Sequence, residues 1–568
     1  MAITRWPEIK KKYKIYSSQK YGAIKTSYVN PKAFEDAVTE NPYQMIHVYL
    51  NKPFKQADQL VLQLFPRLRK SMMRCKWCCL DKLKKNESYG HTRMGASELF
   101  GEVSKEYPEV SEFIFEAVTK SDMFHYEPER KLVSLMNTYE DEERIANTIR
   151  KKLSAPVEDA DMNWEEYEEY KEVDGFKLTD EQIGLLKAVC ENNVVMLNGS
   201  AGTGKTSATK ALVQMLEDNL KSFTLLAPTG IAAKRLAQAT GYSASTIHRH
   251  LASRHFIGDY LIIDEMSMVG VGLLASLFYN IPDKTKIIFI CDEAQLASIS
   301  CGNIVKDIVD SGIVPIVNLT KVFRYGIGGI ATVATDIRNG KPLTTNMNFD
   351  DFAFEPIIDN PIDSVLSVYN GLLTNYDKDD IMILSPFNVQ KAGTYAINNA
   401  IQSAYNSNPV LTSYTRQSTE ISFKRGDRIV NTENNYHIMG DHGEIAVMNG
   451  DMGHVLDYDE HEKLLRVEFD DGVAHLETGD VFKQLLGYCI SVHKSQGTQA
   501  KAVIVVIDSS HGFFLTRNLC YVATSRAQEK LIIVGDINTI NNALNVQEEK
   551  RRNTWLKELL VNSNEAIN

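Results

Sequence analysis

The chain has 568 residues, and since single hydrophobic cores stop growing at roughly 250 to 300 residues, this length predicts several domains. A hydrophobic content of 43% and a charged content of 24% are typical of globular proteins, and the formal net charge of −11 excludes a uniformly basic surface. The 62 lysines and arginines can still line a local channel for nucleic acid. The start of the chain lacks the apolar core of a secretion signal, and a run of ~18 apolar residues is missing throughout. We therefore expect no membrane association and a cytoplasmic location.

Residues 1–154 alternate short helical patterns with basic clusters, which predicts a mainly helical N-terminal domain. The apolar residues Leu60, Val61 and Leu64 recur at helical spacing. A basic helical region either contacts a phosphate backbone or forms a solvated face, and the sequence alone leaves both interpretations open.

Cys75, Cys78 and Cys79 raise the question of a zinc site. A structural zinc site usually shows a second ligand pair at regular spacing, and this sequence has none. The pattern therefore favours ordinary helical cysteines over zinc ligands. The scattered placement of the eight cysteines is typical of a reducing compartment.

Residues 155–176 are rich in aspartate and glutamate, which predicts a linker or an exposed acidic helix at a domain boundary. Trp164, Tyr167 and Tyr170 recur at a spacing of three residues. We expect this segment to dock an aromatic stripe on a neighbouring part of the protein.

An apolar run at 194–197 leads directly into the sequence GSAGTGKT, which is the complete P-loop pattern. The run predicts a buried strand, and the glycines allow the following turn to bring backbone N–H groups around phosphate oxygens. A helix is expected to start near Lys205, whose side chain reaches the β- and γ-oxygens, while the hydroxyl of Thr206 is placed to ligate Mg²⁺. The residues expected around the phosphates are Gly199, Ser200, Ala201, Gly202, Thr203, Gly204, Lys205 and Thr206.

From Leu178 onward, short apolar runs alternate with helical patterns, as in a parallel sheet that is covered on both faces. The predicted strands form a first set at 194–197, 223–226, 261–263, 287–290 and 316–319, and a second set at 381–384, 502–507 and 531–534. Two α/β domains of one type are therefore expected. Within the second, strand-like pieces between 416 and 482 are joined by turn signals, which predicts a small inserted all-β barrel.

Two carboxylates follow the strand at 261–263. In a P-loop enzyme, Asp264 is expected to hold Mg²⁺ and Glu265 to polarise the attacking water as general base. Gln295 follows the next strand, where its amide can sense the γ-phosphate. Arg324 and Arg526 are candidate arginine fingers, because phosphoryl transfer needs positive charge at the transition state.

Together these motifs resemble helicase superfamily one, and more closely its 5′→3′ branch of RecD-like helicases. The resemblance covers about 178–537 and extends more weakly into the N-terminal region, at 41–43, 54–58 and 90–92. Besides the P-loop and the Asp-Glu pair, the segments that carry it are 178–182 (LTDEQ), 227–230 (APTG), 232–233 (AA), 245–248 (STIH), 384–386 (LSP), 426–428 (GDR), 434–436 (NNY), 449–451 (NGD) and 492–497 (VHKSQG).

The resemblance implies an α/β fold with two RecA-like parallel-sheet P-loop domains, an SH3-like β-barrel inserted in the second, and a mainly helical N-terminal domain. The expected boundaries are 1–154 for the N-terminal domain, 155–176 for the linker, 177–320 for the first RecA-like domain, 321–415 and 483–545 for the second, 416–482 for the barrel and 546–568 for a C-terminal tail.

The resemblance also implies residue roles. Gln182 would read the adenine, and Gly497 would join the nucleotide contacts of Gln295, Arg324 and Arg526. The residues that would line a single-strand track are Pro228, Thr229, Thr246, His248, Pro386 and His493.

The implied function is an ATP- and Mg²⁺-dependent DNA helicase that translocates 5′→3′ on single-stranded DNA and acts at junctions with duplex. One alternative is a translocase that removes bound proteins and unwinds weakly; another is a non-catalytic nucleic-acid-binding subunit, against which the retained catalytic motifs argue. We expect a monomer that works with single-strand-binding or replication proteins in replication, recombination or repair. A chain shorter than the cellular RecD-like proteins suits a phage or a mobile element.

Three features depart from the family pattern. Cys291 replaces the usual Gly before the Asp of its motif, and Gln499 replaces a common Glu; we expect these to alter nucleotide affinity at most. RecD-like helicases also carry a β-hairpin pin between the STIH motif and the Asp-Glu strand, and here only 249–259 lie in that interval. Two strands of ~4 to 5 residues with a tight turn would use all of it. We expect a stub with Phe256 as its only aromatic and a wedge shared with the barrel or the N-terminal region; the alternative is a connecting loop.

Overall fold

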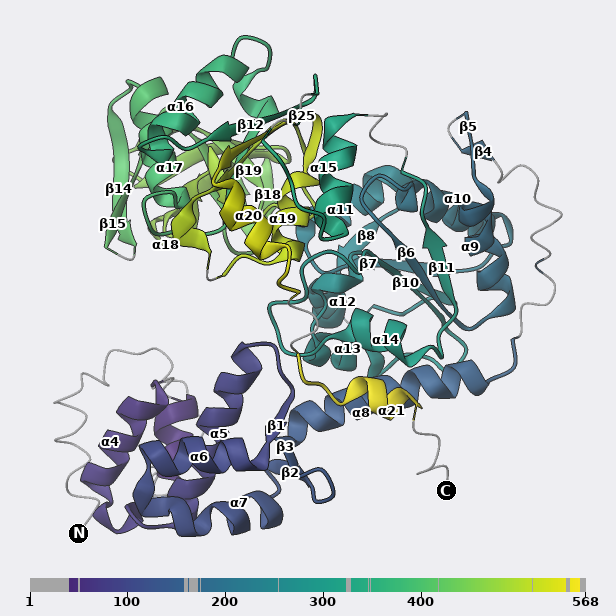
Figure 1. Ribbon diagram of the computed structural model, residues 1–568, viewed down its shortest axis with the longest axis vertical. Helices are drawn as coiled ribbons and strands as arrows, with labels where there is room; N and C mark the ends of the chain where they lie inside the picture. The colour runs from purple at the N-terminus through teal and green to yellow at the C-terminus, as the bar shows by residue number, and fades with distance from the viewer. Residues whose placement is uncertain are drawn as a thin grey trace. The chain divides into compact units, whose positions relative to one another are not determined.

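The computed structural model in Figure 1 describes residues 40–49, 52–157, 162, 172–173, 175–253, 255–322, 328–345, 347, 349–416, 418–512, 514–547 and 552–561. The chain forms two compact units. Unit 1 comprises Met1–Arg144, Ile299–Gly302 and Arg552–Leu556, and unit 2 comprises Ile145–Ser298, Asn303–Arg551 and Lys557–Asn568. Among the helices within the described ranges, none combines the length and the apolar character needed to cross a bilayer. The expected aromatic stripe at 164–170 lies outside the described residues.

Unit 1 is mainly helical, as predicted, but it also contains a three-stranded sheet. Leu60, Val61 and Leu64 are buried in its core, which confirms the helical spacing read from the sequence. The helices are α4 (Phe54–Leu64), α5 (Met72–Ser88), α6 (Ala96–Glu106), α7 (Ile114–Lys120) and the start of α8 (Met136–Ser154). The strands are β1 (Arg93–Gly95), β2 (Phe124–Glu127) and β3 (Leu132–Leu135), in the order β1-β3-β2.

The three clustered cysteines are part of this core. Cys75, Cys78 and Cys79 lie on α5 and are fully buried. Burial raises the pKa of the Cys78 thiol well above its ordinary value, so the thiolate that a metal would require is disfavoured. Within the described ranges, no group of His, Cys, Asp or Glu is arranged to hold a metal ion.

A segment from the C-terminal tail completes unit 1. Trp555 is 3% exposed and meets His125 and Tyr139 edge-on, and Arg93 lies over its ring. The carboxylate of Glu142 accepts the backbone N–H of Trp555 at 3.3 Å. Within the expected tail at 546–568, the segment Arg552–Leu556 is therefore packed as part of unit 1.

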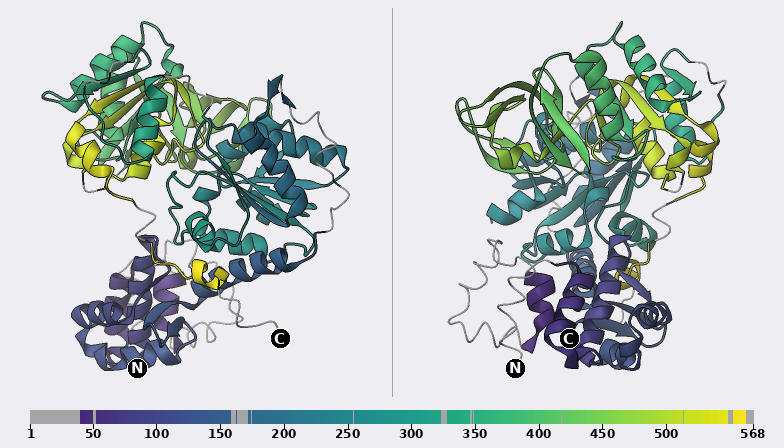
Figure 2. Two further views of the ribbon diagram at one scale, coloured as in Figure 1. Left: turned by 45° about the vertical axis from the view of Figure 1, so that its right-hand side comes forward. Right: turned by 90° about the vertical axis from the view of Figure 1, so that its left-hand side faces the viewer.

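The first lobe of unit 2 is a six-stranded parallel sheet with the order β11-β6-β10-β9-β7-β8. Its strands are β6 (Val194–Gly199), β7 (Phe223–Ala227), β8 (Ala244–Thr246), β9 (Tyr260–Ile263), β10 (Lys286–Cys291) and β11 (Ile316–Leu319). Five of them confirm predicted strands; β8 was missed because it is three residues long and mostly polar. Helices α9 (Asp180–Glu191), α10 (Lys205–Asp218), α11 (Gly230–Thr240), α12 (Ile247–Ser253), α13 (Val271–Phe278) and α14 (Ile304–Ser311) cover the two faces (Figure 2).

The second lobe is a five-stranded parallel sheet with the order β12-β25-β24-β13-β23. Its strands are β12 (Phe352–Pro356), β13 (Ile381–Ser385), β23 (Cys489–Ser491), β24 (Ala500–Ile507) and β25 (Ala527–Gly535). Its helices are α15 (Gly329–Arg338), α16 (Pro361–Leu372), α17 (Thr394–Tyr405), α19 (Arg517–Thr524) and α20 (Ile537–Ala543). Two RecA-like α/β lobes are thus present, as expected.

The insertion in the second lobe is antiparallel, which agrees with the expected all-β region. A hairpin of β14 (Val410–Arg416) and β15 (Thr419–Lys424) precedes a seven-stranded sheet with the order β18-β17-β21-β20-β19-β16-β22. That sheet consists of β16 (Arg428–Asn431), β17 (Asn435–Gly440), β18 (Gly443–Val447), β19 (Met452–Asp459), β20 (Leu464–Phe469), β21 (Gly472–Leu476) and β22 (Gln484–Leu486). Its buried side chains belong to the same core as those of the second lobe, so the insertion is packed on that lobe.

The short interval before β9 corrects the expected pin stub. Ile247–Ser253 form helix α12, because Thr246 Oγ1 accepts the N–H of Arg249 at 3.1 Å and caps the first turn. Only 254–259 remain before β9, which is too short for two paired strands. The alternative of a connecting loop therefore holds, and Phe256 is 79% exposed on it.

Candidate active site

The P-loop forms a concave turn between β6 and α10. Gly202 and Gly204 have φ angles of 83° and 82°, the left-handed region that favours glycine, and Gly204 caps α10. A side chain at Gly199 would meet Thr203 Oγ1 at 2.6 Å, so the turn leaves no room for one. Backbone N–H groups at the start of a helix are thereby directed at one position, which is the standard site for a phosphate group.

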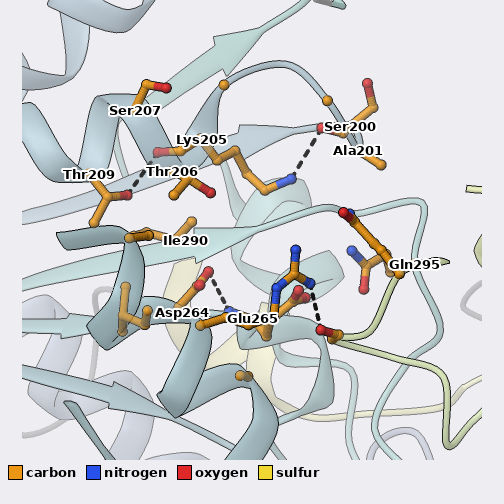
Figure 3. Close-up of a pocket in the computed structure, with 18 of the residues that line it drawn as sticks. Ser200, Ala201, Lys205, Thr206, Ser207, Thr209, Asp264, Glu265, Ile290 and Gln295 are labelled. Carbon is orange, nitrogen blue, oxygen red and sulfur yellow. Dashed lines mark hydrogen bonds between the residues drawn. The ribbon is translucent and has the colours of Figure 1, made fainter. Parts of the chain in front are cut away.

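Lys205 is folded onto the loop that it follows. Its Nζ donates to the carbonyl oxygens of Gly199 at 2.6 Å and of Ser200 at 3.2 Å, and Figure 3 shows the second of these bonds. Both acceptors are neutral, so a phosphate oxygen would compete with them strongly for the ammonium group.

The Asp-Glu pair lies at the carboxyl end of β9, and both side chains line the same cavity as the P-loop (Figure 3). Asp264 Oδ1 accepts the N–H of Glu265 at 2.8 Å, and Glu265 adopts a left-handed φ of 50°. Such a backbone is strained for a residue other than glycine, and strain of this kind clusters at functional sites. Burial and the charge of Glu265 raise the pKa of Asp264 to about 6, while the charges of Lys205 and Arg235 act in the opposite direction.

Gln295 brings a buried acceptor to the cavity. Its side chain is 5% exposed, yet Oε1 makes no hydrogen bond with any residue in the described part of the chain. A buried acceptor without a hydrogen bond costs folding free energy in a protein interior. Its presence here fits a site that binds a water molecule or another hydrogen-bond donor.

The cavity has a volume of about 450 Å³ and is completed from the second lobe by Gly497, Gln499 and Arg526. These residues lie at the amino ends of β24 and β25, whereas the first lobe contributes the carboxyl ends of its strands. Arg526 is 3% exposed, and its Nε donates to Val522 O at 3.0 Å while Nη2 donates to Ser525 Oγ at 3.0 Å. Its guanidinium is thus held in place by its own lobe.

Sequence reasoning missed one cation in the cavity, Arg235 of α11. Its Nη1 donates to the carbonyl oxygen of Gly497 at 2.5 Å, across the two lobes. A signal was present: Thr229 caps α11, and Ala232, Leu236 and Ala239 share with Arg235 one helical face that lines the cavity.

Three expected nucleotide residues, Gln182, Gly199 and Thr203, are not among the residues that line the cavity. Gln182 forms a capping box with Thr179, and its Nε2 donates to Gly204 O at 3.2 Å and to Thr203 O at 3.3 Å. It supports the P-loop backbone and is absent from the residues that line the cavity. Arg324 lies outside the described residues.

The expected track residues follow the carboxyl ends of neighbouring strands. Pro228 and Thr229 follow β7 and Thr246 ends the adjacent β8, while Pro386 follows β13 and His493 follows the adjacent β23. His248 is exposed on α12. In the first lobe, the residues expected at the nucleotide follow β6, β10 and β9, whereas the track residues lie at the ends of β7 and β8. The nucleotide residues and the track residues therefore occupy neighbouring parts of the same carboxyl edge of the sheet.

Comparison with known proteins agrees with this arrangement. The AAA domain model matches residues 177–351, and the UvrD-like helicase C-terminal domain model matches residues 486–534. Over 432 residues, the chain is 28% identical to the ATP-dependent RecD2 DNA helicase of Deinococcus radiodurans, covering 74% of this chain and 57% of that protein. The chain is thus similar to RecD-like DNA helicases.

The chain is also 25% identical over 409 residues to the RecD subunit of the RecBCD enzyme of Mycolicibacterium smegmatis, covering 63% of this chain and 71% of that subunit. The matched part of the RecD2 helicase is little more than half of that protein's length. Among solved structures, Bacteroides Pif1 bound to single-stranded DNA aligns with a TM-score of 0.42 at 20% identity, covering 63% of this chain and 92% of that one.

Proposed function

We propose that this protein is an ATP-dependent DNA helicase that translocates 5′→3′ on single-stranded DNA and unwinds duplex. The observation that carries the proposal is the single cavity to which the first lobe gives the P-loop, Asp264 and Glu265 and the second lobe gives Arg526. A nucleotide in such a cavity contacts both lobes, so binding favours closure and hydrolysis favours opening.

The residues fit ATP with Mg²⁺. The P-loop N–H groups and Lys205 would hold the phosphates, and Thr206 and Asp264, which both line the cavity, would hold the metal. Mg²⁺ would neutralise charge that develops on the phosphate oxygens. Glu265 would accept the proton of the attacking water, and the unpartnered Gln295 Oε1 would orient that water.

Coupling to DNA would run through the segment 492–499. It leaves the carboxyl end of β23 beside the track residue His493 and reaches the amino end of β24 beside Gly497 and Gln499 at the cavity. Because β23 and β24 are parallel, this turn-rich segment crosses the length of the sheet. A displacement of this segment at the nucleotide would therefore reach the track residue His493 through only a few residues of backbone.

Polarity and the choice of DNA rest on the family resemblance. Weak unwinding with efficient translocation is a second candidate, favoured by the finding that the described part of 249–259 forms a helix and a loop and no β-hairpin. Five further expectations stay predictions: a monomeric state, a cytoplasmic location, partners that bind single strands or act in replication, a role in replication, recombination or repair, and an origin in a phage or mobile element.

The test is ATP hydrolysis with and without single-stranded DNA, followed by unwinding of forks that carry a 5′ or a 3′ tail. We expect DNA-stimulated hydrolysis and unwinding of the 5′-tailed fork only, with Lys205→Ala inactive in both assays. Stimulated hydrolysis without unwinding would select the translocase, and absence of hydrolysis would select the non-catalytic subunit.

A further inference from the structure

Helix α11 of the first lobe bonds directly to the second lobe and to its insertion. Arg235 donates to Gly497 O, and the neighbouring Lys234 pairs with Asp471 at 2.6 Å and with Asp451 at 3.4 Å on the insertion. The two adjacent cations differ in one respect: Arg235 lines the nucleotide cavity, and Lys234 does not.

Arg235 is a guanidinium that the first lobe contributes to this cavity, which Asp264 and Glu265 also line. Its 2.5 Å bond goes to a neutral carbonyl oxygen, which is a weaker partner than a phosphate oxygen. Arg526, in contrast, donates hydrogen bonds to Val522, Ser525 and Thr498 in its own lobe.

The carbonyl that Arg235 binds belongs to Gly497, a residue that packs closely against α11. Gly497 has a φ of 79°, and a Cβ at that position would lie 3.8 Å from the N of Ala232, in contact with α11. Four residues earlier in the same turn-rich segment is His493, which follows β23. A displacement of Gly497 would therefore reach the track side of the second lobe through a short stretch of backbone.

We propose that Arg235 is a nucleotide-responsive residue, which exchanges the Gly497 carbonyl for an oxygen of the terminal phosphate when a nucleoside triphosphate enters the cavity. The exchange would release the segment 492–499 from α11 in the triphosphate state and restore the bond after the terminal phosphate leaves. This inference rests on the proposed ATP-dependent function and names the residue that reports the state of the nucleotide.

The test compares affinities for ADP and for a non-hydrolysable ATP analogue, with Mg²⁺, in the full chain. In Arg235→Gln, we expect the affinity for the analogue to fall on the order of 10- to 100-fold, the range of one charge-assisted hydrogen bond, while the affinity for ADP changes by less than about 2-fold. Arg235→Lys, which keeps the charge but loses the fork, should fall between the two.

Lys234→Gln is the matched control, because it also weakens a contact between α11 and the second lobe but removes nothing from the cavity. Its two affinities should match those of the wild type. A second readout is the ratio of single-stranded DNA affinities measured with the ATP analogue and with ADP. This ratio should differ from one in the wild type and approach one in Arg235→Gln.

Equal loss of both nucleotide affinities in Arg235→Gln, or no loss of either, would overturn the proposal and leave Arg235 as a joint between the lobes. A wild-type protein that binds neither nucleotide would instead overturn the proposed function itself, so the two failures are distinguishable.

Discussion

The phenol of Tyr521 in the second lobe donates to the carboxylate of Asp292 in the first, with 2.8 Å between Oη and Oδ2. The same oxygen accepts the N–H of Ala201 in the P-loop at 3.0 Å. Burial and the Asp292 charge raise the pKa of Tyr521 well above 10, so the phenol keeps its proton and can donate. One side chain therefore joins the P-loop, the strand end beside Gln295 and the helix that leads to Arg526.

Tyr521→Phe removes this link while keeping the ring. We expect a loss of stability of about 1–3 kcal/mol, because Asp292 is fully buried and loses a donor. Urea unfolding measures it, and Tyr89→Phe, on a tyrosine that is 66% exposed, should change nothing. DNA stimulation of ATP hydrolysis should fall as well; an unaltered mutant in both assays would mean that the contact is incidental.

Lys205→Ala and Glu265→Gln separate binding from chemistry. Lys205→Ala should abolish hydrolysis with the fold intact, since it removes a charge from the loop and no core volume. Glu265→Gln should still bind ATP but turn over slower by orders of magnitude, because the water loses its base. Nucleotide affinity and kcat decide this, and wild-type turnover in Glu265→Gln would refute the assignment of the base.

Arg526→Ala should lower turnover on the order of 10³-fold if the guanidinium stabilises the transition state. Because this side chain is also bonded within its own lobe, the mutant needs a measurement of folding by circular dichroism. Arg526→Lys, which keeps the charge, serves as the comparison. An unchanged DNA-stimulated kcat in a folded Arg526→Ala mutant would remove it from the active site.

The raised pKa of Asp264 predicts a link between pH and Mg²⁺. Below pH of about 6 the carboxyl is protonated and loses its affinity for the metal, so at limiting Mg²⁺ kcat/KM should fall as the pH drops through this value. Saturating Mg²⁺ should move the fall to lower pH, since metal and proton compete. For folding without metal the sign is opposite: the folded-state pKa exceeds 3.8, so this group's contribution to stability decreases as the pH rises from 3.8 to about 6. A pH profile that does not change with the Mg²⁺ concentration would contradict the role of Asp264 as a metal ligand.

Trp555→Ala should destabilise unit 1 by about 3–5 kcal/mol, the usual cost of removing a large buried aromatic side chain. Hydrogen exchange should show the loss in the helices of unit 1, with the lobes of unit 2 protected as before. Tyr89→Ala is the control, because that ring is mostly exposed. Equal protection in mutant and wild type would show that 552–556 contribute little to the unit.

Sequence patterns alone predicted most of the elements that carry chemistry. The P-loop, the Asp-Glu pair after a buried strand and Gln295 after the next are local patterns, because each combines a continuous apolar run with the polar residues that directly follow it. Parallel topology then requires these strand ends to meet at one edge. The short strands β8 and β12 and the sheet of unit 1 escaped prediction, because brief or partly exposed strands leave little periodicity.

Tertiary structure decided what depends on contacts between distant segments. The bond from Arg235 to Gly497 joins residues 262 positions apart, and that from Tyr521 to Asp292 joins residues 229 positions apart. The cap at Thr246 starts a helix in the interval where the pin was expected. Gln182 is held against the P-loop by its capping box with Thr179 and by the bonds from its Nε2 to the carbonyl oxygens of Thr203 and Gly204. The tail segment at Trp555 became part of unit 1 because its ring is buried there. Local sequence specifies which elements form, whereas side chains such as these are placed by the neighbours that folding brings to them.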